Sequence, residues 1–308
     1  MLTGIVIIAI TVGFFALRFV SAYFFDAFVG LIVLASTYEV CRAFKQNGKL
    51  NDIYFVLCYP VLCYLSLVLC VYQELNLFIY FAIIIGLAGL LFLITYLLNL
   101  FQKNKINKEM VDNSFIGTKN NYAIKKSLRN LFLMIYPAFV LSILFVVNHL
   151  RDFSYFAEIS GNLELFVLIM IFVTTIVTDT GAYLIGSGIG GKKLCPKISP
   201  KKTISGAIGG VLASVAFSLI LYAIFFGITQ YATMLKSHNL GIVGFVLFGI
   251  FASIYTQCGD IFASLIKRKN GLKDFSNIFP GHGGFMDRVD GMSFNVIFAL
   301  IFVLIYFV

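Results

Sequence analysis

The side chains best suited to chemistry gather in one stretch, residues 258–291, of a chain that is 60% hydrophobic and only 12% charged. Four of them are spaced at i, i+4, i+7 and i+8, as neighbours on one face of a helix would be. A carboxylate, a hydroxyl and two cations would then be presented together. These residues are Asp260, Ser264, Lys267 and Arg268.

This helix is expected to end at Asn270–Gly271, because Asn and Gly are common at helix C-termini and the preceding basic residues suit the negative end of the helix dipole. The loop that follows contains Lys273 and Asp274 and then three glycines around His282. Glycines let backbone N–H groups approach an anion closely, as phosphate-binding loops do. We therefore expect His282, Gly283 and Gly284 to contact a phosphate, whereas capping of a turn explains Asp274 equally well.

Two further carboxylates, Asp287 and Asp290, lie one helical turn apart on either side of Arg288. This spacing suits two ligands of one hard cation. Carboxylates for a divalent metal, together with cations and a glycine loop for phosphates, are typical of a nucleotide or pyrophosphate site.

A second loop, residues 186–210, is rich in glycine and lysine and is expected to open a helix at Thr203. Free N–H groups and the helix dipole would point at an anion there. Just before this loop, Asp179 forms an i, i+4, i+8 stripe with Thr175 and Tyr183. A carboxylate at membrane depth is costly, so we expect it to face a polar cavity or a cation, with structural pairing alone as the alternative.

The rest of the chain is typical of a polytopic, all-α integral membrane protein. Its mean hydropathy of +0.96, its 34 Phe and its lack of Trp do not fit an ordinary soluble domain. The net charge of +9 is expected to reflect cations in cytoplasmic loops and beside anionic headgroups. Nothing besides the charge favours nucleic-acid binding. About nine segments could span a membrane: 3–17, 20–38, 53–72, 77–99, 130–148, 163–186, 207–228, 240–263 and 292–308.

The cations predict the orientation of these spans. Basic loops at 42–51, 100–129, 187–206 and 264–291 alternate with loops that carry few cations, which places the amino terminus and the basic loops in the cytoplasm. Arg18 is the exception to this pattern. We divide the chain into N-terminal helices with a basic loop, residues 1–128, and a C-terminal catalytic domain, residues 129–308.

The remaining candidates are assigned no chemistry. The six cysteines lack metal-ligand spacing and are expected to be free, buried and inert. His149 and His238 fall in loops predicted to lie on the non-cytoplasmic side, where we expect them to be solvated. Asp26 receives no role, and no cleavable signal peptide is expected.

Two sequence motifs resemble the signature of the phosphatidate cytidylyltransferases, also called CDP-diacylglycerol synthases. The first has the pattern S-x-x-K-R-x4-K-D, a spacer and H-G-G-x-x-D-R-x-D, and begins here at Ser264. The second has D-x-x-A-Y, a glycine-rich turn and S-P-K-K-T-x-E-G-x-x-G-G, and begins at Asp179. The chain departs from it at Ser205, where the family usually has Glu, and at Ser187, where it usually has Arg. The resemblance covers about residues 179–291.

The resemblance implies a reaction in which CTP and phosphatidate give CDP-diacylglycerol and pyrophosphate. It implies Mg²⁺ on Asp260, Asp287 and Asp290, with room for a monovalent cation such as K⁺, and a supporting role for Asp179. Catalytic roles fall to Asp260, Asp287, Lys267 and Arg288. Substrate binding falls to Ser199, Lys201, Lys202, Thr203, Ser264, Arg268, Lys273, His282, Gly283 and Gly284. The expected location is the inner (plasma) membrane, with the site on the cytoplasmic side, and the resemblance allows a homodimer.

Three other functions fit parts of the pattern. A transporter for a phosphorylated solute would share the spans and basic loops, but no internal repeat is visible. A CDP-alcohol phosphotransferase would share Asp287, Asp290 and Gly291, but the residues that follow do not continue that family's motif. A lipid-alcohol kinase that uses CTP is the third alternative.

Overall fold

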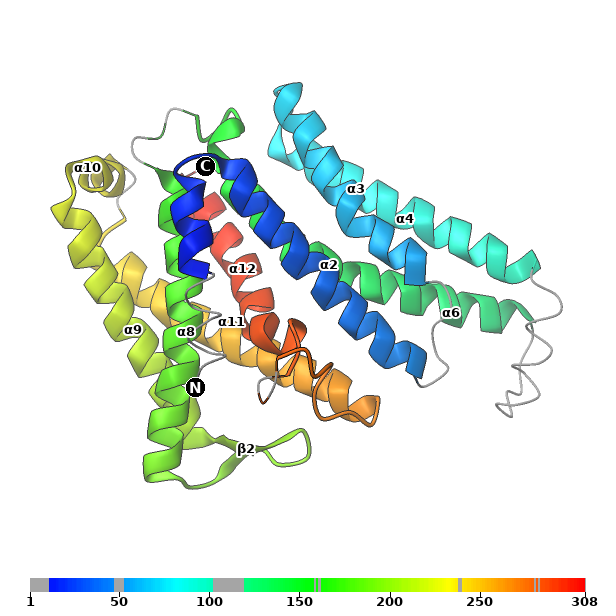
Figure 1. Ribbon diagram of the computed structural model, residues 1–308. Helices are drawn as coiled ribbons and strands as arrows, with labels where there is room; N and C mark the ends of the chain where they lie inside the picture. Colours follow the sequence, from blue (N-terminus) through cyan, green and yellow to red (C-terminus); the bar gives the residue numbers. More distant parts are fainter. Residues whose placement is uncertain are drawn as a thin grey trace. The chain divides into compact units, whose positions relative to one another are not determined.

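The computed structural model describes residues 11–46, 53–101, 119–157, 159, 162–237, 240–279, 281 and 283–307. Among these residues, eight helical segments are long and apolar enough to cross a membrane, which confirms the all-α polytopic prediction (Figure 1). They correspond to eight of the nine predicted spans, and most of the span predicted at 3–17 lies outside the described residues. The elements are α2 (Ala22–Gln46), α3 (Ile53–Tyr72), α4 (Leu77–Phe101), α6 (Lys119–Leu133), η1 (Met134–Phe139), α7 (Val140–Asn148), η2 (Leu150–Asp152), α8 (Leu163–Ile189), β1 (Lys193–Cys195), β2 (Ser199–Thr203), α9 (Ile204–Gly227), α10 (Thr229–Ser237), α11 (Ile242–Lys269) and α12 (Met286–Phe307).

The chain forms two compact units, one of residues Gly30–Ser142 and one of Met1–Val29 with Ile143–Val308. The division that we predicted after residue 128 followed the motifs and stays a prediction, whereas the compact units divide after Val29 and Ser142. Within the Gly30–Ser142 unit, α4 packs against α3 and α6. The discontinuous unit contains every described residue to which the sequence assigns chemistry, so it is the one that concerns function.

Four helices of the discontinuous unit pack closely together: α8, α9, α11 and α12. Small residues allow this approach, as is common between membrane helices. A Cβ atom on Gly206 of α9 would lie 2.7 Å from the carbonyl oxygen of Ala182 on α8. A buried polar contact joins α12 to α8, because the Asn295 amide donates to the hydroxyls of Thr174 and Thr175 at 3.1 and 2.9 Å. These contacts fix α9 and α12 relative to α8, and with them the site residues that these helices carry.

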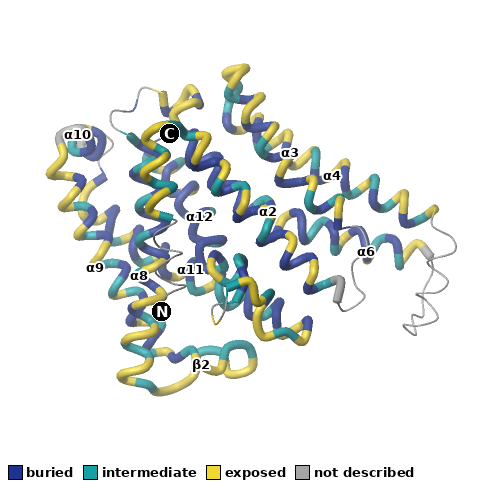
Figure 2. Tube along the Cα trace, viewed as in Figure 1, coloured by how far each residue is buried: buried dark blue, intermediate teal, exposed yellow. Residues whose placement is uncertain are grey.

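A short antiparallel hairpin connects α8 directly to α9. Lys193 pairs with Thr203 and Cys195 with Ser199 across β1 and β2. Thr203 then caps α9 by accepting a hydrogen bond from the Gly206 N–H at 3.1 Å, which confirms the helix start predicted from the sequence. Most of the hairpin is exposed or half-buried, in contrast to the largely buried α12 (Figure 2). Because both flanking helices are membrane spans, the hairpin must lie at one membrane surface.

The expectation that His149 is solvated is wrong. The His149 ring is buried between two carboxylates, with Nε2 at 2.8 Å from Asp26 and Nδ1 at 2.6 Å from Asp152. Burial alone would lower its pKa, but hydrogen bonds and charge attraction from both aspartates raise the pKa to about 9. Asp26, which was assigned no role in the sequence analysis, thus belongs to a buried polar cluster. His238 lies outside the described residues.

Candidate active site

The ammonium group of Lys267 is the centre of the candidate site. It lies in the last turn of α11, where the basic residues confirm the helix end predicted at Asn270. Its Nζ is 2.7 Å from Asp287 Oδ1 and 3.9 Å from Asp290 Oδ2, both on α12. It also lies 5.4 Å from the centre of the Phe275 ring. The lysine side chain is only 9% exposed, so its charge depends on these two carboxylates.

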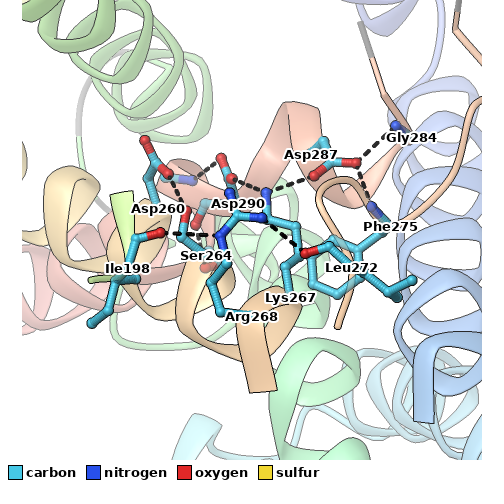
Figure 3. A network of polar contacts seen from close by, with 12 residues as sticks. Ile198, Asp260, Ser264, Lys267, Arg268, Leu272, Phe275, Gly284, Asp287 and Asp290 are labelled. Atoms are coloured by element: carbon cyan, nitrogen blue, oxygen red, sulfur yellow. Dashed lines mark hydrogen bonds and ion pairs between the residues drawn. The ribbon is translucent and has the colours of Figure 1, made fainter. Parts of the chain in front are cut away.

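Asp287 closes the loop between α11 and α12. Its Oδ2 accepts hydrogen bonds from the backbone N–H groups of Phe275 and Gly284, both at 2.9 Å, while Oδ1 faces Lys267 (Figure 3). The loop also needs Gly283, which has φ of +78°, and where a Cβ atom would lie 2.8 Å from Asp287 Oδ2. The glycine motif therefore wraps around this carboxylate.

Asp260 lies on α11 and pairs with the hairpin. Its Oδ2 is 2.6 Å from the Nζ of Lys202 on β2, and its Oδ1 accepts a hydrogen bond from Ser264 at 3.3 Å. Both charged side chains are about a quarter exposed. Substrate and solvent can reach this ion pair more easily than the buried pair of Lys267 and Asp287.

Asp290 lies at a close contact between α11 and α12. A Cβ atom on Gly259, the residue before Asp260, would lie 2.5 Å from the Asp290 carbonyl oxygen. The Asp290 Oδ1 accepts a hydrogen bond from the Gly291 N–H at 2.9 Å. This contact between glycine and backbone brings the carboxylates of Asp260 and Asp290 within electrostatic range of each other.

Asp179 joins the site through its charge. It lies on α8 within electrostatic range of Asp260, Lys202 and Arg288. Its side chain is exposed, as is that of Tyr183, whereas Thr175 is buried. The stripe predicted on α8 therefore passes from the helical core to an open polar region. Arg288 is also exposed, one residue beyond Asp287.

Arg268 holds the hairpin against the end of α11. Its guanidinium donates to the carbonyl oxygens of Ile198 and Leu272 at 3.2 and 3.0 Å (Figure 3). At the base of the hairpin, the Ser205 hydroxyl donates to the Gly190 carbonyl oxygen. In this chain Ser205 thus ties the two ends of the hairpin together, at the position where the resembled family usually has Glu.

The other predicted residues differ in where they lie. Ser199 is half-buried in β2, while Lys201 and Lys273 are exposed. His282 lies outside the described residues. The sequence analysis missed Phe275 and Gly259. The sequence contains no signal for Phe275, whereas the position of Gly259 directly before Asp260 in an apolar helix could have indicated it.

The donor set suits a hard divalent cation. Asp260 and Asp290 offer carboxylate oxygens, and Mg²⁺ commonly uses one or two carboxylates together with water and substrate phosphates. Within the described residues, no group of three or more His, Cys, Asp or Glu side chains is arranged to hold a metal by itself. The three predicted ligands are instead interleaved with Lys202 and Lys267. Water molecules or phosphate oxygens would therefore complete the coordination.

Comparison with known proteins gives consistent matches. The sequence profile described as "Cytidylyltransferase family" matches residues 1–306. A phosphatidate cytidylyltransferase of Bacillus subtilis is 39% identical over 145 residues, which are 46% of this chain and 49% of the relative. The phosphatidate cytidylyltransferase of Aquifex aeolicus is 37% identical over 174 residues, which are 56% of each chain. That of Staphylococcus haemolyticus is 42% identical over 123 residues, which are 40% of this chain and 43% of the relative. The matched region thus spans about half the length of these curated relatives.

Proposed function

The chain belongs to the cytidylyltransferase family, and from this premise we propose that it transfers the cytidylyl group of CTP to phosphatidate, giving CDP-diacylglycerol and pyrophosphate. The observation that carries the proposal is the convergence of Asp260 and Asp290 with Lys202 and Lys267 at one end of membrane-spanning helices. Such a site can hold a nucleoside triphosphate while a membrane lipid presents its headgroup. The relatives named as phosphatidate cytidylyltransferases support this substrate pair.

The proposed reaction is an in-line displacement at phosphorus. An oxygen of the phosphatidate phosphate forms a bond to the α-phosphorus of CTP, and the bond from that phosphorus to the β-phosphate oxygen breaks. Pyrophosphate leaves with the bonding electrons. A phosphate monoester is already a nucleophile at neutral pH, so positioning and charge neutralisation would contribute more to the rate than a general base.

The chain's own cations would provide much of this neutralisation. Lys202 and the exposed Arg288 would bind phosphates that enter from the open side of the site. Lys267 is held by Asp287 and Asp290 at a fixed place, so it would present a pre-positioned charge to the transition state. Lys201 and Lys273 would contact the outer phosphates, whereas the Gly284 N–H already donates to Asp287 and does not bind a phosphate in this arrangement.

We propose Mg²⁺ as the divalent metal, held by Asp260 and Asp290. When bound, it would neutralise phosphate charge and polarise the α-phosphorus. Asp287 could be a third ligand only through Oδ1, because two backbone N–H groups already occupy its Oδ2. A monovalent cation such as K⁺ and a homodimer are also proposed, and the resemblance alone supports them.

The proposed location is the inner (plasma) membrane with the site facing the cytoplasm. The support is the pattern of basic loops, because the hairpin and the loop from α11 to α12 are both rich in cations and both carry site residues. CTP is a cytoplasmic metabolite, so this orientation would give the enzyme direct access to its nucleotide. Cys58 and Cys258 are exposed, against the expectation that the cysteines are buried, but both lie within membrane spans. Cysteine labelling of intact and opened vesicles at Cys195, which lies in the hairpin between α8 and α9, would test the orientation.

The decisive experiment uses purified protein in detergent with Mg²⁺, phosphatidate and CTP labelled at the α-phosphate. We expect label to enter the organic phase with one pyrophosphate released per lipid labelled. Transfer from γ-labelled CTP instead would show a kinase. A folded protein that neither transfers label nor binds CTP would refute the proposal and favour a transporter.

A further inference from the structure

We propose that the Lys202 ammonium group takes the place of the divalent metal on Asp260 before the metal binds, and that metal binding releases Lys202 to a phosphate of the nucleotide. This inference rests on the proposed function for the identity of the phosphate. The exchange itself can be measured without any turnover. It assigns Lys202 two successive partners instead of one.

The two lysines at the carboxylates differ in how firmly they are held. Lys267 contacts two aspartates and an aromatic ring, and its side chain is 9% exposed. Lys202 contacts a single aspartate, and its side chain is 25% exposed. An ion pair that solvent reaches this easily is weak and changes an equilibrium constant by about fivefold or less. Lys202 is therefore the one of the two that can leave its carboxylate at low cost.

The backbone that carries Lys202 stays in place while its side chain moves. The hairpin is fixed at its base by the Ser205 hydroxyl and by the Thr203 cap of α9, and at its turn by the Arg268 bond to Ile198. The aliphatic stem of lysine has four rotatable bonds, so its ammonium can change partner without any movement of the strand. The exchange thus requires only a change of side-chain rotamer.

The charges around Asp260 favour the exchange. The carboxylates of Asp179 and Asp290 both lie within electrostatic range of Asp260. No acidic residue occurs between Asp179 and Asp260 in the sequence, so the carboxylate partner of Lys202 has to come from another element. A divalent cation neutralises this group of carboxylates better than one ammonium group. The displaced lysine then lies beside the phosphates that the metal attracts.

The test measures Mn²⁺ affinity by electron paramagnetic resonance on the full-length protein in detergent without CTP. Mn²⁺ replaces Mg²⁺ at oxygen-ligand sites and gives a direct signal. The Lys202→Gln variant removes the competing cation, so we expect it to bind Mn²⁺ more tightly, by up to about fivefold. Lys201→Gln is the matched control, because it removes the same charge from the adjacent exposed position, and we expect a smaller change.

Two further variants exclude trivial explanations. In an Asp260→Asn background, Lys202→Gln should no longer tighten Mn²⁺ binding, because the shared carboxylate is gone. Lys202→Arg keeps the charge and should bind Mn²⁺ no more tightly than the wild type. Should Lys202→Gln fail to give a monodisperse protein, Lys202→Met preserves the length and the apolar stem and takes its place.

Equal or weaker Mn²⁺ binding by the Lys202 variant would overturn the exchange, as would a wild-type protein that binds no Mn²⁺. Neither result depends on cytidylyl transfer, which the labelled-CTP assay measures separately. When transfer occurs, the exchange also predicts a higher KM for CTP in Lys202→Gln than in Lys201→Gln. Failure of the exchange and failure of the proposed function are therefore distinguishable.

Discussion

The replacement of Asp287 by asparagine gives the sharpest test of the candidate site. The amide oxygen can still accept the backbone N–H groups of Phe275 and Gly284, which lie 2.9 Å from the native Oδ2. The amide NH₂ group would then face the Lys267 ammonium in place of Oδ1, which is 2.7 Å away in the native protein. Two donors would meet, and Lys267 would retain only Asp290 at 3.9 Å.

The expected losses follow from the burial of this pair. Removal of one partner of a buried ion pair costs about 3–5 kcal/mol. Asp287→Ala would in addition leave two backbone N–H groups without an acceptor, at about 1–3 kcal/mol each. We therefore expect stability to fall in the order wild type, Asn variant, Ala variant. Turnover should fall about 100-fold or more in both, because a pre-positioned charge in the site is lost.

The assay follows α-labelled CTP into lipid, and thermal unfolding in detergent is followed by tyrosine fluorescence, since the chain has no Trp. Asp152→Asn is the matched control, because it makes the same chemical change near the amino-terminal end of α8, and it should retain turnover. Mn²⁺ binding then separates two roles for Asp287. Weaker binding by the Asn variant would support a direct metal ligand, and unchanged binding would support a role through Lys267. Near wild-type turnover of a folded Asp287 variant would refute the reasoning.

Three further outcomes are expected. Gly259→Ala should lower turnover, and should lower stability by about 1–3 kcal/mol, because its Cβ would lie 2.5 Å from the Asp290 carbonyl oxygen. In the control Gly89→Ala the Cβ meets nothing within 4 Å, so turnover and stability should stay unchanged. Equal effects of the two variants would contradict this account. The pKa of His149 is raised to about 9 in the folded protein, so its stabilising contribution of about 3 kcal/mol should be complete below about pH 6.5 and be lost as pH rises through 9. Thermal unfolding of His149→Gln should lack this pH dependence, and a wild-type protein equally stable at both ends of the range would contradict it. Thr203→Ala should cost about 1 kcal/mol in thermal unfolding through the lost cap of α9, and an unchanged unfolding temperature would show that the cap contributes nothing.

Local features of the chain were predictable because they depend on short-range physics. Apolar runs predicted all eight spans among the described residues, because a span needs only enough consecutive apolar residues to cross the membrane. The end of α11 at Asn270 and the start of α9 after Thr203 follow from capping preferences, which act within one helical turn. The spacing of Asp287 and Asp290 likewise placed them on adjacent turns of one helix.

Partnerships between elements were decided only by the tertiary structure. No sequence rule pairs Lys202 with Asp260 or Lys267 with Asp287, because these contacts depend on how α11, α12 and the hairpin approach one another. The same holds for His149. Hydropathy places it in a short connection between spans and predicts that it is solvated, but its ring packs between Asp26 and Asp152. The sequence by itself indicated candidate residues for chemistry and placed Asp179, Asp260 and Asp290 on the helices that carry them. Which charged side chains pair was decided by helix packing at glycine contacts such as Gly259. Residues far apart in the sequence can pair only where their two backbones come close together.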